Sequence, residues 1–269
     1  MTTVSRVLSQ LEIFAPARWT QLVHPKDNVG LLVGHEHAPV SRVLVALDVS
    51  DRIAGEAVRS GAQLIVTHHP VIYGSGLRAI VDTTPGGRLL LSLIENNIAV
   101  ICMHTNWDAA PGGVNDLLAR VVGLEGELGF LGSSYTDPDG RRFGLGRVGY
   151  LPAPLSAEEL ADTVRAALGC RHVRYVDGGR PCRFVAVGSG NSTSQWSDVI
   201  AHGCDAFITG DVGYHLNQEA HLACVTLIDA GHFPTERIIV KPVVTFLQER
   251  LPDVEVLESD TEDEPTQWI

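Results

Sequence analysis

The chain has 269 residues, of which 45% are hydrophobic, and this length and composition support one or two globular domains. Its net charge is −12 and no run of Lys or Arg stands out, which argues against a nucleic-acid partner. No apolar stretch reaches the ~20 residues that a membrane span needs, and the N-terminus lacks the apolar core of a signal peptide. We therefore expect a cytoplasmic protein with no membrane partner.

In the first half of the chain, short apolar runs alternate with segments of helical spacing. The expected strands are 43–48, 63–67 and 98–103. The expected helices are 3–14, about 51–60, 86–96 and 112–121, with a turn at 27–30 and a loop over 71–85. Because strands and helices alternate, we predict the α/β class, with mostly parallel sheets covered by helices on both faces.

The pattern breaks between about 123 and 140, where Gly, Ser, Asp and Pro cluster. We place a domain boundary there, which predicts a metal-site α/β domain over 1–128 and 228–269 and a second α/β domain over 129–227. The expected strands of the second half are 143–150, 172–176, 183–188, 205–209, 224–229 and 253–258. The expected helices are 157–168, about 193–202, 213–221 and 234–250. The acidic residues 259–265 are expected to be frayed.

Four polar clusters stand where apolar strands end. Each cluster contains residue types that ligate metals or move protons, and the four are Thr67-His68-His69-Pro70, His104-Thr105-Asn106-Trp107-Asp108, Thr209-Gly210-Asp211 with His215, and Gly231-His232-Phe233-Pro234-Thr235-Glu236. Open α/β sheets bind ligands beyond the carboxyl ends of their strands. Imidazoles and carboxylates arriving there together match the ligands of a transition metal, so we predict one or two bound ions.

The first two clusters supply the sharpest local signals. Pro70 holds His69 extended, so His68 and His69 can splay around two ions with one imidazole each. Asp108 offers a hard oxygen ligand. His104, four residues earlier, is interpreted as a residue that supports a ligand or contacts substrate rather than as a direct ligand.

The last two clusters repeat a spacing of four residues. His232 and Glu236 would lie on one helical face, where Glu236 either bridges two ions or serves only as a first-turn acid favoured by the helix dipole. Asp211 and His215 are candidates for a general acid/base pair. They also fit a supporting layer around the ligands, or a helix cap beside a surface histidine.

A short glycine-rich turn, Gly188-Ser189-Gly190, follows the strand 183–188. It either presents N–H groups to an anion or is only a tight turn. Independently, two divalent ions held by one Asp, one Glu and neutral histidines would retain positive charge. Such a centre attracts an anionic small-molecule substrate.

The ordered set of motifs resembles one family, the Nif-three-like dinuclear metal-centre proteins, whose members are often called homologues of GTP cyclohydrolase I type 2. The resemblance covers most of the chain. Its motifs are Asp27-Asn28-Val29-Gly30-Leu31 with Gly34, Thr67-His68-His69-Pro70, His104-Thr105-Asn106 with Asp108, Gly188-Ser189-Gly190, Thr209-Gly210-Asp211 with His215, and Asp229-Ala230-Gly231-His232 with Thr235-Glu236. One departure is Lys26, where the family often has Trp.

The resemblance implies that His69 and Asp108 hold one metal, that His68 and His232 hold the other, and that Glu236 bridges them. It also implies two interlocked α/β domains and a toroidal homohexamer. The expected activity is metal-dependent hydrolysis of a phosphorylated or nucleotide-like small molecule, including a GTP-cyclohydrolase-type ring opening, with His104, Asp211 or His215 moving protons. The alternative is a metal-binding scaffold or metallochaperone without turnover. The donor set accepts Zn, Fe, Mn, Co or Ni, so the sequence does not name the metal.

Overall fold

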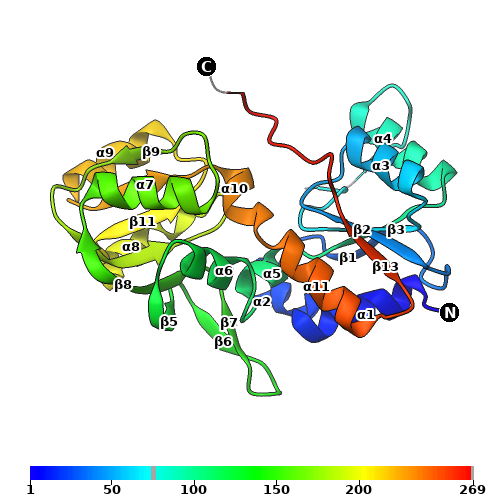
Figure 1. The fold of residues 1–269 in the computed structure, drawn as a ribbon, viewed down its shortest axis with the longest axis horizontal. Coiled ribbons are helices and arrows are strands. Elements are labelled where there is room, and N and C mark those ends of the chain that lie inside the picture. The colour runs from blue at the N-terminus through cyan, green and yellow to red at the C-terminus, as the bar shows by residue number, and fades with distance from the viewer. Residues whose placement is uncertain (74–76, 268–269) are drawn as a thin grey trace. The chain divides into compact units, whose positions relative to one another are not determined.

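The computed structural model describes residues 1–73 and 77–267, and its contacts divide the chain into two compact units (Figure 1). The first consists of Met1–Trp107 and Ile239–Pro265, and the second of Asp108–Ile238 with residues 266–267. The sequence analysis places the boundaries near 128 and 228 instead. The structural division therefore moves Asp108, His232 and Glu236 into the second unit.

The first unit is built on a five-stranded sheet with the strand order β1-β4-β3-β2-β13. Its strands are β1 (Gly30–Val33), β2 (Arg42–Ala46), β3 (Leu64–Thr67), β4 (Ala99–Cys102) and β13 (Glu255–Glu258). Its helices are α1 (Val4–Phe14), α2 (Thr20–Val23), α3 (Asp51–Ser60), α4 (Pro85–Glu95) and α11 (Val240–Arg250), with a 3-10 turn at Ala17–Trp19. The helix α5 (Thr105–Ala109) contains the boundary between the units.

Successive residues of the strands in the first sheet point to opposite faces, and both faces are buried. Leu44, Ile65 and Val100 pack with apolar side chains of α3 and α4, including Ile53 and Leu90. Figure 1 shows α3 and α4 on this face of the sheet and α1 and α11 on the opposite face. The strands β13, β2, β3 and β4 are parallel, so their carboxyl ends meet at one edge of the sheet. That edge is where ligands bind in α/β sheets.

The second unit contains a six-stranded sheet with the order β5-β8-β10-β11-β12-β9 and a separate hairpin, β6-β7. Its strands are β5 (Glu125–Phe130), β6 (Ser134–Thr136), β7 (Arg142–Gly144), β8 (Arg147–Leu155), β9 (Arg174–Val176), β10 (Cys182–Val187), β11 (Ala206–Thr209) and β12 (Thr226–Asp229). Its helices are α6 (Val114–Val121), α7 (Ala157–Ala167), α8 (Trp196–His202), α9 (Tyr214–Leu222) and α10 (His232–Arg237), with a 3-10 turn at Thr193–Gln195.

The period-two alternation of strands also builds the two cores of this unit. Val185, Ile208 and Ile228 face a cluster that includes residues of α6 and α7. Phe207 and Leu227 face the other side, with residues of α8 and α9. Both faces of the central strands are therefore covered, which is why these strands read as continuous apolar runs.

The α/β class is confirmed. Both sheets are mixed, but the first is mostly parallel, as predicted, and the second is not. In the first sheet β1 runs antiparallel to β4. In the second sheet only β10, β11 and β12 are parallel to one another, and β5, β8 and β9 join by antiparallel pairing. A hairpin connection needs few residues, so antiparallel strands can follow directly after the helix α6 without a crossover helix.

Three local expectations are wrong. The segment 123–140 contains two strands, β5 and β6, although Gly132 and Gly140 lie outside them. The expected helix 234–250 is two helices, α10 and α11, interrupted by a turn at residues 238–239, where the two units meet in sequence. The segment 259–265 is not frayed, because Ser259 donates a hydrogen bond to Glu56 and Glu262 accepts one from Leu47. Within the expected loop 71–85, residues 74–76 lie outside the described residues.

Among the described helices, none has the length and apolar content required to span a bilayer.

Candidate metal centre

The paired histidines follow β3 directly, and each ring uses its Nδ1 on a protein acceptor. His68 Nδ1 lies 3.1 Å from the Met103 carbonyl oxygen, and His69 Nδ1 lies 2.8 Å from Asp48 Oδ1. A carbonyl or an ionised carboxylate only accepts, so each ring carries its proton on Nδ1. Nε2 is then the nitrogen that would reach an ion, which is the usual arrangement of metal-ligating histidines.

His104 repeats this arrangement after β4. Its Nδ1 lies 2.7 Å from Asp27 Oδ1, while the other oxygen of Asp27 accepts from the backbone N–H and the hydroxyl of Thr105. Burial raises the pKa of the Asp27 carboxyl, but the hydrogen bonds and charge of His104 and the bonds from Thr105 outweigh it and hold that pKa well below its usual range. Asp27 is therefore an ionised, almost fully buried support for the His104 ring.

The three imidazoles of the first unit converge. The ring centroids of His68 and His69 lie 4.9 Å apart, and those of His68 and His104 lie 5.0 Å apart. One ligand nitrogen from each of the three rings lies within 4.8 Å of the others, a spacing that could hold a metal ion. His68 is fully buried and stacks against Trp107 with an interplanar angle of 6°.

Asp27→Asn should weaken the first unit in a pH-dependent way. A carboxyl whose pKa is lowered by folding adds stability above its unfolded pKa, and this contribution disappears as the pH falls toward the folded value. At pH 7 we expect the variant to lose about 3 kcal/mol of unfolding free energy. At pH 3 the difference from the wild type should shrink. Urea unfolding at both pH values measures this, and an equal loss at both would contradict an ionised Asp27 beside His104.

In the second unit, His232 and Glu236 lie on α10, which begins directly after β12. His232 Nε2 lies 3.1 Å from Glu236 Oε2, and His232 Nδ1 lies 2.7 Å from Asp211 Oδ2. The predicted common helical face is therefore confirmed. Asp211 supports the His232 ring as Asp48 supports His69. The backbone φ of Asp211 is 55°, a left-handed conformation that few residues other than Gly adopt.

Asp108 is buried and held by two neighbours. Ser189 Oγ donates to Asp108 Oδ1 at 3.1 Å, and the Asn115 side-chain amide donates to the Asp108 carbonyl at 3.0 Å. A carboxylate oxygen of Asp108 also lies within 4.8 Å of one of Glu236. Two buried carboxylates this close repel each other, so the pair favours a cation.

The turn Gly188-Ser189-Gly190 packs closely against two of these candidate ligands, Glu236 and His232. A Cβ atom built on Gly190, whose φ is +53°, would lie 2.0 Å from Glu236 Oε1 and 2.8 Å from His232 Nε2. The backbone N–H groups of the turn donate to Ile208, Asn115 and Thr235. These donors are used within the protein, so the tight-turn reading holds and the anion-binding reading is wrong.

Ser189→Ala should reduce metal affinity about tenfold without unfolding the protein, because Asp108 loses a donor that fixes its carboxylate. A competition titration against a chromogenic chelator measures the affinity. Ser197→Ala, an exposed serine on α8, is the matched control. Equal affinities of the two variants would show that Ser189 does not orient Asp108.

His215 is the predicted site residue with the least support. It is exposed on α9, and its ring makes an edge contact with Tyr214 at 5.7 Å between centroids. Sequence reasoning missed Asp48, Asn115 and Arg147 as parts of the site, and it named Ser189 only within the glycine-rich turn. Asp48 stands at the end of a predicted strand, which was an available signal. For Arg147 the sequence offered no signal, because an arginine within a strand usually faces solvent.

Arg147 is a buried cation beside Asp108. Its guanidinium pairs with Asp116 and donates to the carbonyls of Ala109 and Ala110, directly after Asp108 in the chain. Burial lowers the pKa of this guanidinium, while Asp116 and Asp108 oppose the shift. Because arginine remains protonated in proteins, Arg147 stays a fixed positive charge that anchors the end of α5.

The fold and these two clusters define an α/β protein with residues that could hold a metal ion. Its sequence matches the model of the Duf34/NIF3 (NGG1p interacting factor 3) family over residues 2–265, and the chain belongs to this family. The resemblance predicted from the motifs is therefore confirmed.

Relatives and solved structures agree with this membership. A GTP cyclohydrolase 1 type 2 homolog of Clostridium perfringens is 32% identical, with 98% of both chains covered. A protein of the same name from Streptomyces coelicolor is 39% identical over 88% of this chain and 82% of its own. The crystal structure of a Bacillus cereus protein related to NIF3 matches the fold with a TM-score of 0.90 and 24% identity, covering 100% of this chain and 99% of the other.

Proposed function

We propose that the protein is a dinuclear-metal-dependent hydrolase acting on a phosphorylated or nucleotide-like small molecule, of the kind suggested by the name GTP cyclohydrolase 1 type 2 homolog that its relatives carry. One observation carries the proposal. Each of the three histidines proposed as ligands, His68, His69 and His232, has its Nδ1 on a protein acceptor. Such orientation fixes the tautomer and aims Nε2 at a ligand, as metal sites require.

The proposed ligand set is the one that the resemblance implies. His69 and Asp108 would hold one ion, His68 and His232 would hold the other, and Glu236 would bridge them. The chemistry of the donors supports this set, since imidazole nitrogens and carboxylate oxygens together suit Zn, Fe, Mn, Co or Ni. The space at Gly190 supports it too, because only a residue without a side chain leaves room for Glu236 and His232.

Bound divalent ions would lower the pKa of a coordinated water and attract an anionic substrate group. The chain's own residues would orient the ligands and move protons. His104 is the best supported proton carrier, because buried Asp27 fixes its ring and directs Nε2 toward the neighbouring histidines. For Asp211, its bond to His232 favours a supporting role over proton transfer. For His215, the described contacts include none with a candidate ligand. Its role in proton transfer therefore remains a proposal.

Turnover by metal-loaded protein tests the function. The protein is loaded in turn with Zn, Mn, Fe, Co and Ni and assayed on GTP, other nucleotides and simple phosphoesters. We expect one metal form to hydrolyse a member of the panel, to lose this activity with chelator and to regain it with the ion. His104→Ala should keep its metal and lose about 10²–10⁴-fold in rate. Stoichiometric metal binding without turnover would favour the scaffold or metallochaperone.

We also propose a homohexamer, as the resemblance implies, and a cytoplasmic location, as the sequence analysis expects. Closed symmetric assemblies are the rule for soluble homo-oligomers. Light scattering at micromolar concentration should give six times the mass of the 28.9 kDa chain, and a monomer would contradict the proposal.

A further inference from the structure

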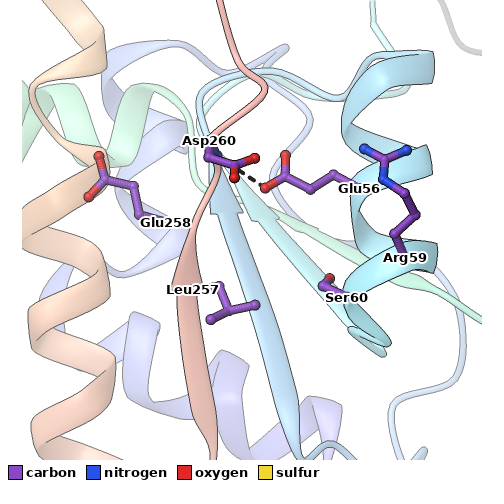
Figure 2. A pocket seen from close by; sticks show the side chains of 6 residues that line it. All are labelled: Glu56, Arg59, Ser60, Leu257, Glu258 and Asp260. Atoms are coloured by element: carbon purple, nitrogen blue, oxygen red, sulfur yellow. Dashed lines mark hydrogen bonds between the residues drawn. The ribbon is translucent and has the colours of Figure 1, made fainter.

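The segment Ser259–Asp263, called the C-terminal strap here, follows β13 and is hydrogen-bonded to α3 and to the residues directly after β2. Glu56 on α3 accepts hydrogen bonds from Ser259 Oγ at 2.7 Å, from the Asp260 backbone N–H at 3.1 Å and from Thr261 Oγ1 at 2.5 Å. Figure 2 shows Glu56 and Asp260 facing each other beside the end of β13. Burial raises the pKa of Glu56, but these bonds outweigh it and lower the pKa, so the acceptor is ionised.

The strap continues to Glu262, which reaches the carboxyl end of β2. Glu262 Oε1 accepts from the backbone N–H groups of Leu47 at 2.6 Å and Asp48 at 2.9 Å. A carboxylate that accepts two backbone N–H bonds is a strong, charge-assisted anchor. The next residue, Asp263, pairs with Arg52 at the surface, at 2.8 Å, where both side chains are more than half exposed.

The peptide that Glu262 holds is also the one that holds the paired histidines. The Leu47 carbonyl accepts from the backbone N–H groups of His68 at 3.1 Å and His69 at 2.9 Å. Asp48 Oδ1 lies 2.8 Å from His69 Nδ1. Contacts therefore run without a gap from Glu262 through Leu47 and Asp48 to both histidines.

We propose that Glu262 is a positioning residue for His68 and His69, so that the docked C-terminal strap sets how tightly the chain holds its metal. The inference rests on the proposed function of these histidines as ligands. Without Glu262, the N–H groups of Leu47 and Asp48 turn to water and the Asp48 carboxylate loses its fixed direction. Ordering that peptide again then costs free energy each time an ion binds.

Three variants of the full chain and one control test the proposal. Glu262→Ala removes the acceptor, Glu262→Asp withdraws it by one methylene group, and Glu262→Gln keeps an oxygen in the same place. Asp263→Ala is the matched control, since it removes the neighbouring carboxylate of the strap without touching Leu47 or Asp48. Zinc and manganese affinities are measured by chelator competition. Amide hydrogen exchange over 64–70 is followed without metal.

We expect Glu262→Ala to bind about 10–100-fold more weakly at unchanged stoichiometry, as for lost support of a ligand. The His68 and His69 amides should exchange faster. Glu262→Gln should recover much of the affinity, and Asp263→Ala should match the wild type. If Glu262→Ala fails to fold, Glu262→Asp carries the same expectation of weakened affinity.

Two outcomes overturn the inference. One is a Glu262 variant that melts at a lower temperature but binds metal as tightly as Asp263→Ala, because the strap would then stabilise only the fold. The other is unchanged exchange at His68 and His69. A wild type that binds neither metal would overturn the proposed function, while exchange at these amides would still decide whether Glu262 positions the histidines.

Discussion

Gly190→Ala should abolish binding of the ion that His232 and Glu236 are proposed to hold, and leave the fold in place. The new methyl group would lie 2.0 Å from Glu236 Oε1 and 2.8 Å from His232 Nε2, so at least one of these side chains must leave its position. Both are proposed ligands, and displacing either one removes a bond to the metal. Elemental analysis of the purified variant measures the remaining metal, and circular dichroism checks the fold.

Gly203→Ala provides a control with the same backbone cost. Gly203 has a φ of +67°, and a Cβ there meets nothing within 4 Å. Both substitutions force alanine into the left-handed region at about 1–2 kcal/mol, but only Gly190→Ala intrudes on the ligands. Full metal content in Gly190→Ala, or an equal loss in both variants, would remove the support that this turn gives to the site.

Glu236→Gln should release at least one ion while leaving the unloaded protein as stable as the wild type or more stable. Glutamine keeps the shape of the side chain but removes its charge, which a bridge between two cations needs. Without metal, the carboxylates of Asp108 and Glu236 lie within 4.8 Å and repel each other, and the substitution relieves this repulsion. The two effects have opposite signs, so general damage to the fold would not reproduce them.

Metal content and thermal unfolding of the unloaded protein check this pair of effects. Glu219→Gln, an exposed acid on α9, is the control for charge alone. Full occupancy of both ions in Glu236→Gln would end the bridging role. A large drop in the melting temperature of the unloaded variant would mean that Glu236 is held for packing instead.

The sequence predicted the strands that carry the site because each signal was local. Apolar runs marked β3, β4, β11 and β12, and polar clusters at their ends marked the candidate ligands. The spacing of His232 and Glu236 placed both on one helical face, as the structure has them. Parallel pairing of β2, β3 and β4 then follows from general rules, since it brings the ends of these strands to one edge.

The partners of the ligands could not be predicted in the same way, because they are distant in sequence. Asp27 and His104 are separated by 77 positions, and Glu262 and Leu47 by 215. No periodicity relates such pairs, and each acid alone is more often a solvated surface charge. The C-terminal strap was wrongly predicted to be frayed for a related reason. An acidic terminal segment is typically frayed unless the fold supplies N–H and hydroxyl donors, and these donors are distant in sequence.

The backbone of Asp211 has a consequence for attempts to make this protein more robust. A left-handed aspartate costs conformational energy that glycine would not, so stability-guided redesign would favour Gly at this position. That exchange removes the carboxylate that directs the His232 ring. Asn keeps the backbone tolerance and an oxygen acceptor but not the charge. Position 211 is thus a place where selection for thermostability and selection for metal chemistry pull in opposite directions.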